Sequence, residues 1–457
     1  MQRLLMVCVM SAGLSSVASS QVCHPELSQV ISPAMGEEGT GLGFSIEIQD
    51  DWAFIAAGLD TVDGVNSGSV HIYHFDGTQW VDQGRVVPPD PQAFQYFGET
   101  ISIDGDTMMI GALGDSDFGA YAGAVYVFDR VDGDWEFMQK LTASDGREGQ
   151  GFRRVFLRGD MAVVGATASI RGKLPGAAYV FERDESGWLE TQKLTPSDSQ
   201  NGDLFGASCE FEDDWMVIGA PFNFDSDEFI QGGAYVFHRE GGSWVETQRL
   251  GPELFGPSSA DFGIDVSIES NQIMVGAPSD GMPGSTGSVY VLEQVGSEWI
   301  ESQRLRPNSN ATRGFGYWVE VDQGRLMSGA PSYSTIGSNE VELFHKVNGI
   351  WMSGGSISSP VSDGNTIFGQ RFALGEDIAM ILALDSGTDR GDVFVYSLEC
   401  DTCAADLSGD TVLTTDDVNM FLAAYSGGSA VADFTLNGTL DFFDVSAFVQ
   451  AFHTGCP

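Results

Sequence analysis

The sequence predicts an all-β fold, a seven-bladed β-propeller with four antiparallel strands per blade, followed by a small α-helical domain. Three observations lead to this prediction. Four short apolar segments recur together about every 54 residues. Glycine is abundant, with 58 among 457 residues, as tight turns require. From Cys400 onward the composition changes, and two acidic loops are each followed by an amphipathic stretch.

Residues 1–20 have the layout of a cleaved secretory signal, and we leave them out of the fold. Arg3 precedes an apolar run from Leu4 to Val9, and small residues follow at Ala18 and Ser20. No later stretch has the roughly 18 uninterrupted apolar residues that a membrane-spanning helix needs. We therefore expect a secreted protein without a membrane span.

The charge balance excludes one large class of partners. The chain has 65 acidic residues against 21 lysines and arginines, a formal net charge of −44. Binding a phosphate backbone requires clustered cations, so nucleic acid is not an expected partner.

The repeating unit is clearest in its second copy. Its apolar segments are Phe97–Gly98, Met108–Ala112, Gly123–Phe128, and Trp135 with Gln139–Leu141. The glycine of the second segment recurs as Gly165, Gly219, Gly276 and Gly329, while Ala56 and Leu382 take its place in the first and last copies. This gives seven units over residues 21–399. We expect this glycine to allow close approach of backbones where blades converge.

The last unit ends near Tyr396 without the tryptophan and without the Gln-Lys-Leu segment. The missing strand is found at the other end of the chain, where Ser28–Pro33 matches Thr191–Pro196. We therefore expect the N-terminal strand to complete the last blade and to close the ring, which removes exposed strand edges. This closure brings Cys23 near Cys400.

Five cysteines follow the signal segment. Outside the cytosol, an odd number suggests two disulfides and one free thiol. The candidates for bridges are Cys23, Cys400, Cys403 and Cys456, and Cys209 is expected to be an unpaired core thiol. A zinc site is the weaker alternative, because Cys400 and Cys403 have no matching second pair.

The unit resembles the FG-GAP repeat, a β-propeller repeat also seen in integrin α-subunit heads and in secreted bacterial proteins. The Phe-Gly pairs that carry the resemblance are Phe97–Gly98, Phe205–Gly206, Phe262–Gly263, Phe315–Gly316 and Phe368–Gly369. The resemblance covers residues 27–398 and implies a binding or adhesion role. Integrin-type units hold calcium in an acidic loop, but here that loop is a short turn such as Asp104–Asp106, so no calcium site is expected in the propeller.

Two acidic 12-residue loops in residues 400–457 predict calcium sites. A hard cation needs six or more oxygen ligands, and this spacing wraps them around one ion. The predicted ligands are Asp406, Ser408, Asp410, Val412, Thr414 and Asp417 in the first loop, and Asp433, Thr435, Asn437, Thr439, Asp441 and Asp444 in the second. Gly438 occupies the sharp turn of the second loop, where the first has Thr411, so the first site is expected to be weaker.

This pair of loop-helix units resembles the type I dockerin family, which attaches secreted proteins to cohesin domains in a calcium-dependent way. The resemblance covers about residues 404–453 and implies two calcium ions and a cohesin-like or surface-anchored partner. The partner-recognition positions of the family fall on Thr415, Asp416, Phe442 and Phe443. Cys403 and Cys456 bracket this domain and are its candidate bridge.

No catalytic constellation stands out in the sequence. His71 and His74 are the only histidine pair near metal-ligand spacing, and on a strand they point to opposite faces. We therefore expect a non-enzymatic binding or adhesion protein whose propeller presents a loop-rich face to a protein or glycan. The alternatives are an enzyme or accessory subunit of an extracellular polysaccharide-degrading complex, and a surface-layer component whose acidity provides solubility.

Overall fold

The structure is a computed structural model of the whole chain. It describes residues 22–33, 39–167, 175–222, 232–251, 261–280, 286–307, 314–331, 339–347, 349–361, 366–385, 387–401, 407, 413–427, 429, 432, 440, 444–446, 448–449 and 452. The chain forms two compact units, a larger one within Cys23–Cys400 and a smaller one that contains Asp401–Pro457.

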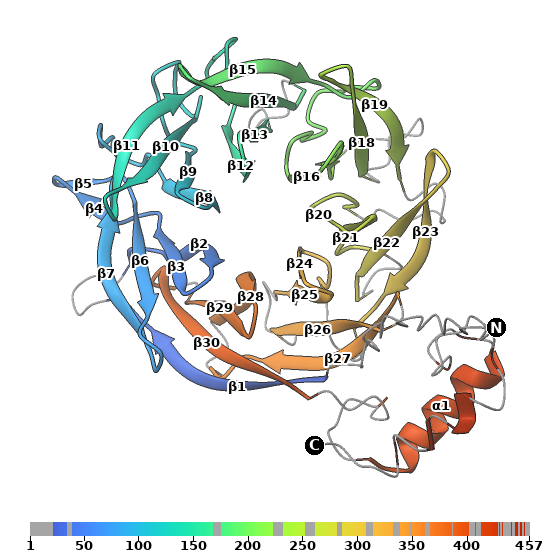
Figure 1. Cartoon of the computed structure of the whole chain (residues 1–457). Helices are drawn as coiled ribbons and strands as arrows, with labels where there is room; N and C mark the ends of the chain where they lie inside the picture. Colours follow the sequence, from blue (N-terminus) through green and yellow to red (C-terminus); the bar gives the residue numbers. More distant parts are fainter. Residues whose placement is uncertain are drawn as a thin grey trace, which may run out of the picture. The chain divides into compact units, whose positions relative to one another are not determined.

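The larger unit is a ring of seven four-stranded antiparallel sheets, as predicted (Figure 1). The first three blades are β2 (Leu42–Gln49), β3 (Trp52–Ala57), β6 (Ser69–Phe75) and β7 (Trp80–Val86); β8 (Phe97–Asp104), β9 (Thr107–Ala112), β10 (Ala124–Val131) and β11 (Asp134–Leu141); and β12 (Phe152–Arg158), β13 (Met161–Ala166), β14 (Ala177–Asp184) and β15 (Gly187–Leu194). A short hairpin, β4 (Thr61–Val62) and β5 (Val65–Asn66), projects from the first blade.

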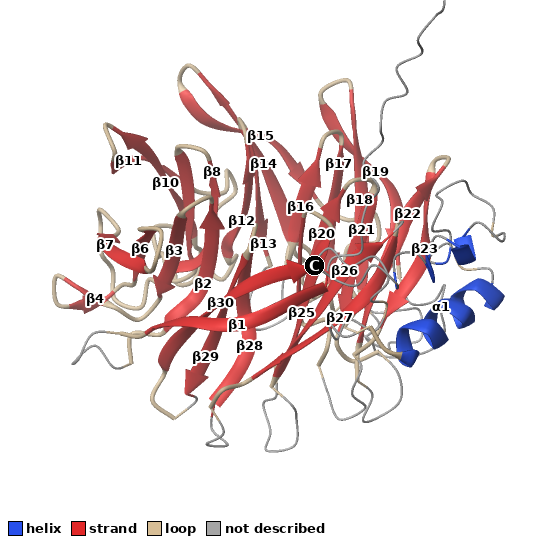
Figure 2. Cartoon of the chain, turned by 60° about the horizontal axis from the view of Figure 1, so that its bottom comes forward, coloured by secondary structure: helices blue, strands red, loops and turns tan. Residues whose placement is uncertain are grey.

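The other four blades repeat this order. They are β16 (Cys209–Glu212), β17 (Trp215–Ala220), β18 (Gly233–Glu240) and β19 (Ser243–Leu250); β20 (Val266–Glu269), β21 (Gln272–Ala277), β22 (Ser288–Val295) and β23 (Glu298–Leu305); β24 (Trp318–Asp322), β25 (Arg325–Ala330), β26 (Glu340–Val347) and β27 (Ile350–Ser358); and β28 (Thr366–Gly375), β29 (Ile378–Asp385), β30 (Arg390–Asp401) and β1 (Val22–Ile31). Figure 2 shows the loops gathered at the two ends of these strands.

The core lies between neighbouring blades. The second strand of a blade is covered on both faces, so every residue of β9, β13 and β21 is buried. This is the reason that these strands are nearly continuous apolar runs rather than alternating ones. The phenylalanine of each Phe-Gly pair is fully buried and contacts an aromatic residue of the third strand, as Phe97 contacts Tyr126 at 5.5 Å between ring centroids and Phe315 contacts Phe344 at 5.9 Å.

The predicted close approach at the recurrent glycine is confirmed. A Cβ atom on Gly165, Gly219 or Gly276 would lie 2.0 Å from the backbone carbonyl oxygen of a glycine in the next blade. Only glycine leaves room for the neighbouring backbone at these positions. The repeat therefore uses this residue to set the distance between blades.

The N-terminal strand closes the ring, as predicted. β1 pairs with β30 and is the outer strand of the last blade. The Gln29 amide donates to the carbonyl oxygen of Trp80 at 2.9 Å and accepts from the Trp80 N–H at 2.8 Å. The same reciprocal contact joins Gln139 to Trp188 at 2.8 and 2.9 Å, so the closing contact is identical in kind to a contact inside the ring.

Part of the smaller unit is described. α1 (Thr415–Gly427) begins with a capping box, because Thr414 Oγ1 accepts from the Asp416 N–H at 3.1 Å while Asp417 Oδ2 accepts from the Thr414 N–H at 2.8 Å. Its core includes Leu407, Phe421, Ala432 and Phe448. The rings of Phe421 and Phe448 stack at 4.1 Å, which agrees with the prediction that the two amphipathic stretches pack together.

Candidate functional site

A cluster of polar side chains lies on one side of the ring. We call this side of the ring the loop face. On this side the chain passes from the second to the third strand of a blade and from one blade to the next. Around blade 2 three connections meet there, residues 87–96, 113–123 and 142–151. They are joined by backbone hydrogen bonds, among them Gly114 N–H to the Gln95 carbonyl at 2.8 Å and Gly151 N–H to the Tyr121 carbonyl at 3.0 Å.

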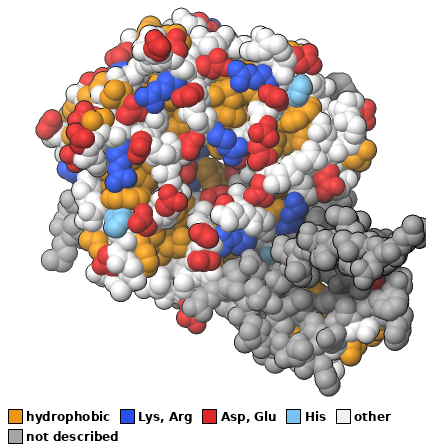
Figure 3. Space-filling model, in the orientation of Figure 1, with side chains coloured by type: hydrophobic (Ala, Val, Ile, Leu, Met, Phe, Trp, Pro, Cys, Tyr) orange, Lys and Arg blue, Asp and Glu red, His pale blue; other side chains and the backbone are white. Residues whose placement is uncertain are grey.

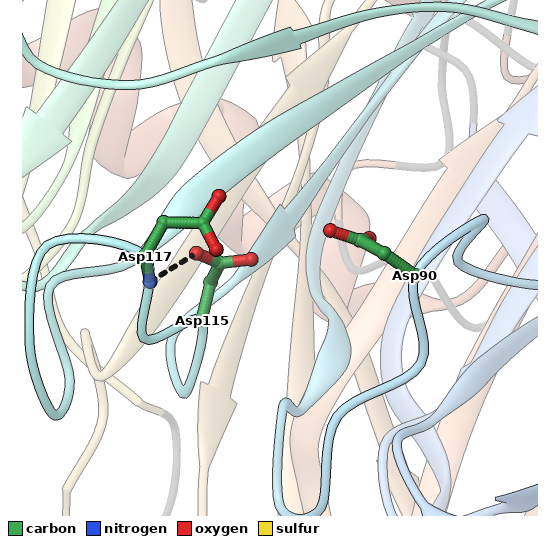
Figure 4. A group of neighbouring side chains, drawn as sticks. All are labelled: Asp90, Asp115 and Asp117. Atoms are coloured by element: carbon green, nitrogen blue, oxygen red, sulfur yellow. Dashed lines mark hydrogen bonds between the residues drawn. The ribbon is translucent and has the colours of Figure 1, made fainter.

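Three carboxylates from two of these connections, Asp90, Asp115 and Asp117, lie close together (Figure 4), and all three contact one lysine. Lys140 Nζ lies 2.9 Å from Asp90, 2.7 Å from Asp115 and 2.6 Å from Asp117. Tyr126 Oη is within hydrogen-bond distance of Asp90, at 2.7 Å, and of the fully buried Asp115, at 2.8 Å. Burial alone would lower the pKa of Lys140, but its hydrogen bonds to the three carboxylates outweigh this effect and raise it.

The spacing of these three carboxylates would also suit a metal ion, since one oxygen of each lies within 4.8 Å of the others. The ammonium group of Lys140 already provides the positive charge at their centre. Related clusters occur in other blades, where a third-strand residue and its cross-strand cation share an aspartate. They are His71 with Arg85 and Asp60, Tyr179 with Lys193 and Asp145, Tyr235 with Arg249 and Asp198, and Tyr290 with Arg304 and Asp280. We interpret the cluster as a structural lock that positions the loop face.

Exposed aromatic side chains surround this lock. Phe94, Phe118 and Tyr121 are 57%, 49% and 43% exposed, and Tyr96 lies near Phe94, with 6.5 Å between ring centroids. We call these four residues the aromatic patch. Phe94, Tyr96 and Tyr121 have left-handed backbones with φ of 57°, 54° and 56°. This conformation is unfavourable for bulky residues and is concentrated at functional sites. The loops therefore hold Phe94 and Tyr121 exposed, and Tyr96 half-buried, at a cost in stability.

A polar channel runs through the centre of the ring, where Figure 3 shows the surface hollowed. It has a volume of about 480 Å³ and is lined by the inner strands of all seven blades. Burial raises the pKa of Glu47 and of Glu210 to about 8 and that of Asp265 to about 7. Burial also raises the pKa of Glu320 well above its ordinary value.

Several channel side chains have a structural role. Each inner strand is an edge of its sheet and has N–H groups without a strand partner. Asp265 accepts from the Val319 N–H at 2.7 Å, and Glu320 accepts from the Leu374 N–H at 2.8 Å. Ser102 does the same for Leu157 at 2.9 Å. One blade therefore caps the exposed edge of the next.

Most of the predicted calcium ligands and partner residues lie outside the described residues. These are Asp406, Ser408, Asp410, Val412, Asp433, Thr435, Asn437, Thr439, Asp441, Phe442 and Phe443. Of the remainder, Asp417 and Asp444, the last residues of the two loops, are both fully buried. Thr415 and Asp416 are the first residues of α1, and the Asp416 N–H donates to the capping Thr414.

The cysteine predictions are tested in part. Cys209 is a free thiol that packs against the core, as predicted, but it is only partly buried because it also borders the channel. Burial by the surrounding strands raises its pKa to about 12. Cys403 and Cys456 lie outside the described residues. Cys23 and Cys400 stand on the paired strands β1 and β30, and their side chains are not described.

Sequence reasoning missed the lock and the aromatic patch. The signal for the lock was present, because the tyrosine and the Lys/Arg of the Gln-Lys-Leu segment recur together and are cross-strand partners, as in Tyr126 and Lys140. The aspartates sit in connections of unequal length, so they have no fixed spacing. The left-handed backbones of Phe94 and Tyr121 have no sequence signature at all.

Comparison with known proteins identifies the repeat. Four segments match the FG-GAP repeat family, at residues 80–128, 135–181, 188–237 and 244–292. Within the ring, residues 80–292 are thus similar to FG-GAP repeats, which supports an FG-GAP-type β-propeller. Each matched segment begins at the outer-strand tryptophan of one blade and ends in the third strand of the next. The matched repeat is thus offset by one strand from the blades. The last blade therefore takes its outer strand from the N-terminal end of the chain, as β1.

Relatives of the propeller include integrin α subunits. Integrin alpha-3 of Mus musculus is 30% identical over 140 residues, which cover 27% of this chain and 12% of the relative. Integrin alpha-7 of Rattus norvegicus is 28% identical over 162 residues, which cover 32% and 14%. The match therefore spans about an eighth of the length of these relatives. Among the described helices, none has the length and apolar character that crossing a membrane requires.

Proposed function

We propose that this chain is an extracellular, non-enzymatic binding protein whose FG-GAP propeller binds a protein ligand through the aromatic patch. The single observation that carries this proposal is the exposure of Phe94, Phe118 and Tyr121 on loops that are fixed from below by the Lys140 lock. Likeness to integrin α subunits supports a role in binding or adhesion.

The patch has the composition of a protein interface. Aromatic side chains provide most of the binding energy at such interfaces, and they do so best when they are held rigidly before the partner arrives. Half-exposed Asp90 and Asp117, at 45% and 47%, add a polar border. The ring of Phe118 packs directly on the neighbouring loop at Gly146. A Cβ atom added to Gly146 would lie only 2.8 Å from this ring.

The test substitutes the two phenylalanines of the patch together. We expect Phe94→Ser/Phe118→Ser to reduce binding to the extracellular surface of the source cells at least tenfold, a loss of about 1.4 kcal/mol or more. The matched control is Leu189→Ser/Val245→Ser, which removes two residues of similar exposure, at 48% and 43%, from outer strands away from the loop face. Equal binding by both double variants would contradict the proposal.

We further propose that residues 400–457 form a calcium-binding docking module for a cohesin-like or surface-anchored partner. Support comes from Asp417 and Asp444, which hold the same position in the two loops and are both fully buried. A carboxylate is buried when cations or hydrogen bonds stabilise it. Asp417 also closes the capping box of α1, so its loop and its helix share one carboxylate.

Calcium should stabilise this module, with the second loop as the stronger site. At 100 times its dissociation constant, one bound ion adds about 2.7 kcal/mol to the free energy of unfolding. We expect Asp433→Ala to weaken calcium binding more than Asp406→Ala, because Gly438 gives the second loop the better turn. Calorimetric titration of the whole chain measures both. Identical titrations of the two variants would show that the ranking is wrong.

A further inference from the structure

A groove between blades 4 and 5 lacks a contact that is present between earlier pairs of blades, in which an arginine of one blade reaches back to the blade before it. It has a volume of about 940 Å³ and includes Trp215, His238, Gln294 and Trp299 in its lining. Trp215 and His238 are cross-strand partners in blade 4, with 4.3 Å between ring centroids, and Trp215 meets the edge of Trp299 at 5.5 Å. All of these residues lie within the larger unit.

Blades 2, 3 and 4 place an arginine at the position that Gln294 holds in blade 5. Arg130, Arg183, Arg239 and Gln294 all stand opposite the tryptophan of their own blade in the same register. Each of the three arginines reaches back to the preceding blade. Arg183 pairs with Asp129 at 2.6 Å, and Arg239 pairs with Glu182.

The closest counterpart of the groove lies between blades 1 and 2. There Trp52 and His74 occupy the positions of Trp215 and His238, with 4.5 Å between ring centroids. The guanidinium of Arg130 stacks over Trp52, with its carbon 4.4 Å from the ring centroid. In blade 5 the shorter, uncharged Gln294 replaces this arginine, and no described residue places a guanidinium over Trp215.

We propose that this groove binds an arginine side chain of a partner protein, whose guanidinium stacks over Trp215 in the place that Arg130 takes over Trp52. A planar guanidinium stacks on an indole and is weakly hydrated, so it fits such a slot better than an ammonium group. Charge favours a basic partner, because the lining has three carboxylates, Glu240, Glu298 and Glu301. The one arginine of the lining, Arg249, is paired with Asp198 at 3.1 Å, and the chain has a net charge of −44. This site lies apart from the aromatic patch and is independent of the proposed function.

The test uses the full chain and two small probes, N-acetyl-arginine amide and its uncharged isostere N-acetyl-citrulline amide. Indole N–H resonances in a proton–nitrogen NMR spectrum report binding, and Trp215→Phe assigns the Trp215 signal. We expect the arginine probe to shift this signal and the citrulline probe to leave it unchanged. Equal shifts with both probes would overturn the proposal.

Gln294→Arg provides the decisive variant, because it restores the internal arginine that three other blades tolerate. We expect it to weaken binding of the arginine probe at Trp215 at least tenfold. The reverse substitution, Arg130→Gln, vacates the slot over Trp52 and should create a second responding indole. Unchanged binding by Gln294→Arg, or a Trp52 signal that does not respond in Arg130→Gln, would each contradict the proposal.

Discussion

Gly219→Ala is expected to lower the free energy of unfolding of the propeller by about 3 kcal/mol, the upper end of what overpacking typically costs. The new Cβ atom would lie 2.0 Å from the carbonyl oxygen of Gly263 and 2.4 Å from Ser208 Oγ. The first of these neighbours is backbone of the next blade, so it cannot turn away as a flexible side chain would. Blades 4 and 5 would have to move apart, which is the kind of overpacking that costs most in a close-packed interior.

Gly233→Ala is the matched control for this substitution. Gly233 lies in the same blade, in the strand next to Gly219, and its added Cβ would find its nearest neighbour at 3.6 Å, an ordinary contact. We expect a change within about 1 kcal/mol, of either sign. Urea unfolding followed by tryptophan fluorescence compares the two variants. Similar midpoints would show that Gly219 does not set the distance between blades.

Removal of residues 21–31 is expected to open the ring and to make the protein aggregate. β1 supplies the outer strand of the last blade, and without it β30 becomes an unpaired edge. The deletion also removes Ile31, which is 4% exposed in the core between the last and first blades, and the two hydrogen bonds between Gln29 and Trp80.

Gln139→Ala separates ring closure from the loss of a single contact. It breaks the same reciprocal glutamine contact inside the ring, where the chain itself still links the two blades. We expect it to cost about 1–2 kcal/mol and to leave a monomer. Light scattering and thermal unfolding distinguish the outcomes. A monomeric, cooperatively folded deletion variant would refute the role of β1 in closure.

The pairing of β1 with β30 also bears on the predicted disulfide between Cys23 and Cys400. Ser28 Oγ donates to the Val395 carbonyl at 3.0 Å, and Ser397 Oγ donates to the Glu26 carbonyl at 3.3 Å. Continuing the antiparallel pairing in this register places Cys23 opposite Cys400. The predicted bridge would then join the two strands that close the ring, and a disulfide across so long a loop constrains the unfolded chain strongly.

The sequence predicted the propeller because its physical causes are local and repeated. Gly219 and its counterparts mark the contact between blades, and the match of Ser28–Pro33 to a fourth strand revealed the closure. The aromatic patch was not predictable in this way. Phe94 and Tyr121 belong to single loops, so they do not recur, and their exposure depends on backbone angles fixed by neighbouring loops.

The groove at Trp215, unlike the aromatic patch, does have a signal in the repeated sequence. In the sequence, the groove is marked by a single departure from the repeat, because Gln294 stands where other units have Arg130, Arg183 and Arg239. This departure can be interpreted only when the structure shows what the three arginines contact. Cys209 lies on the same face of its strand as the buried Phe211 and packs against the core, and it is only half-buried because it also borders the channel.

The most direct test of the account compares residues 21–399 with residues 21–457 and with the Phe94→Ser/Phe118→Ser variant, each used to capture partners from secreted and surface fractions of the source cells. The central claim is that the propeller itself binds a protein ligand. We predict one partner that both lengths of chain retain after washing with EDTA and that the double variant loses. If every captured partner is instead released by EDTA and is absent with residues 21–399, the C-terminal module is the binding part and the claim is wrong.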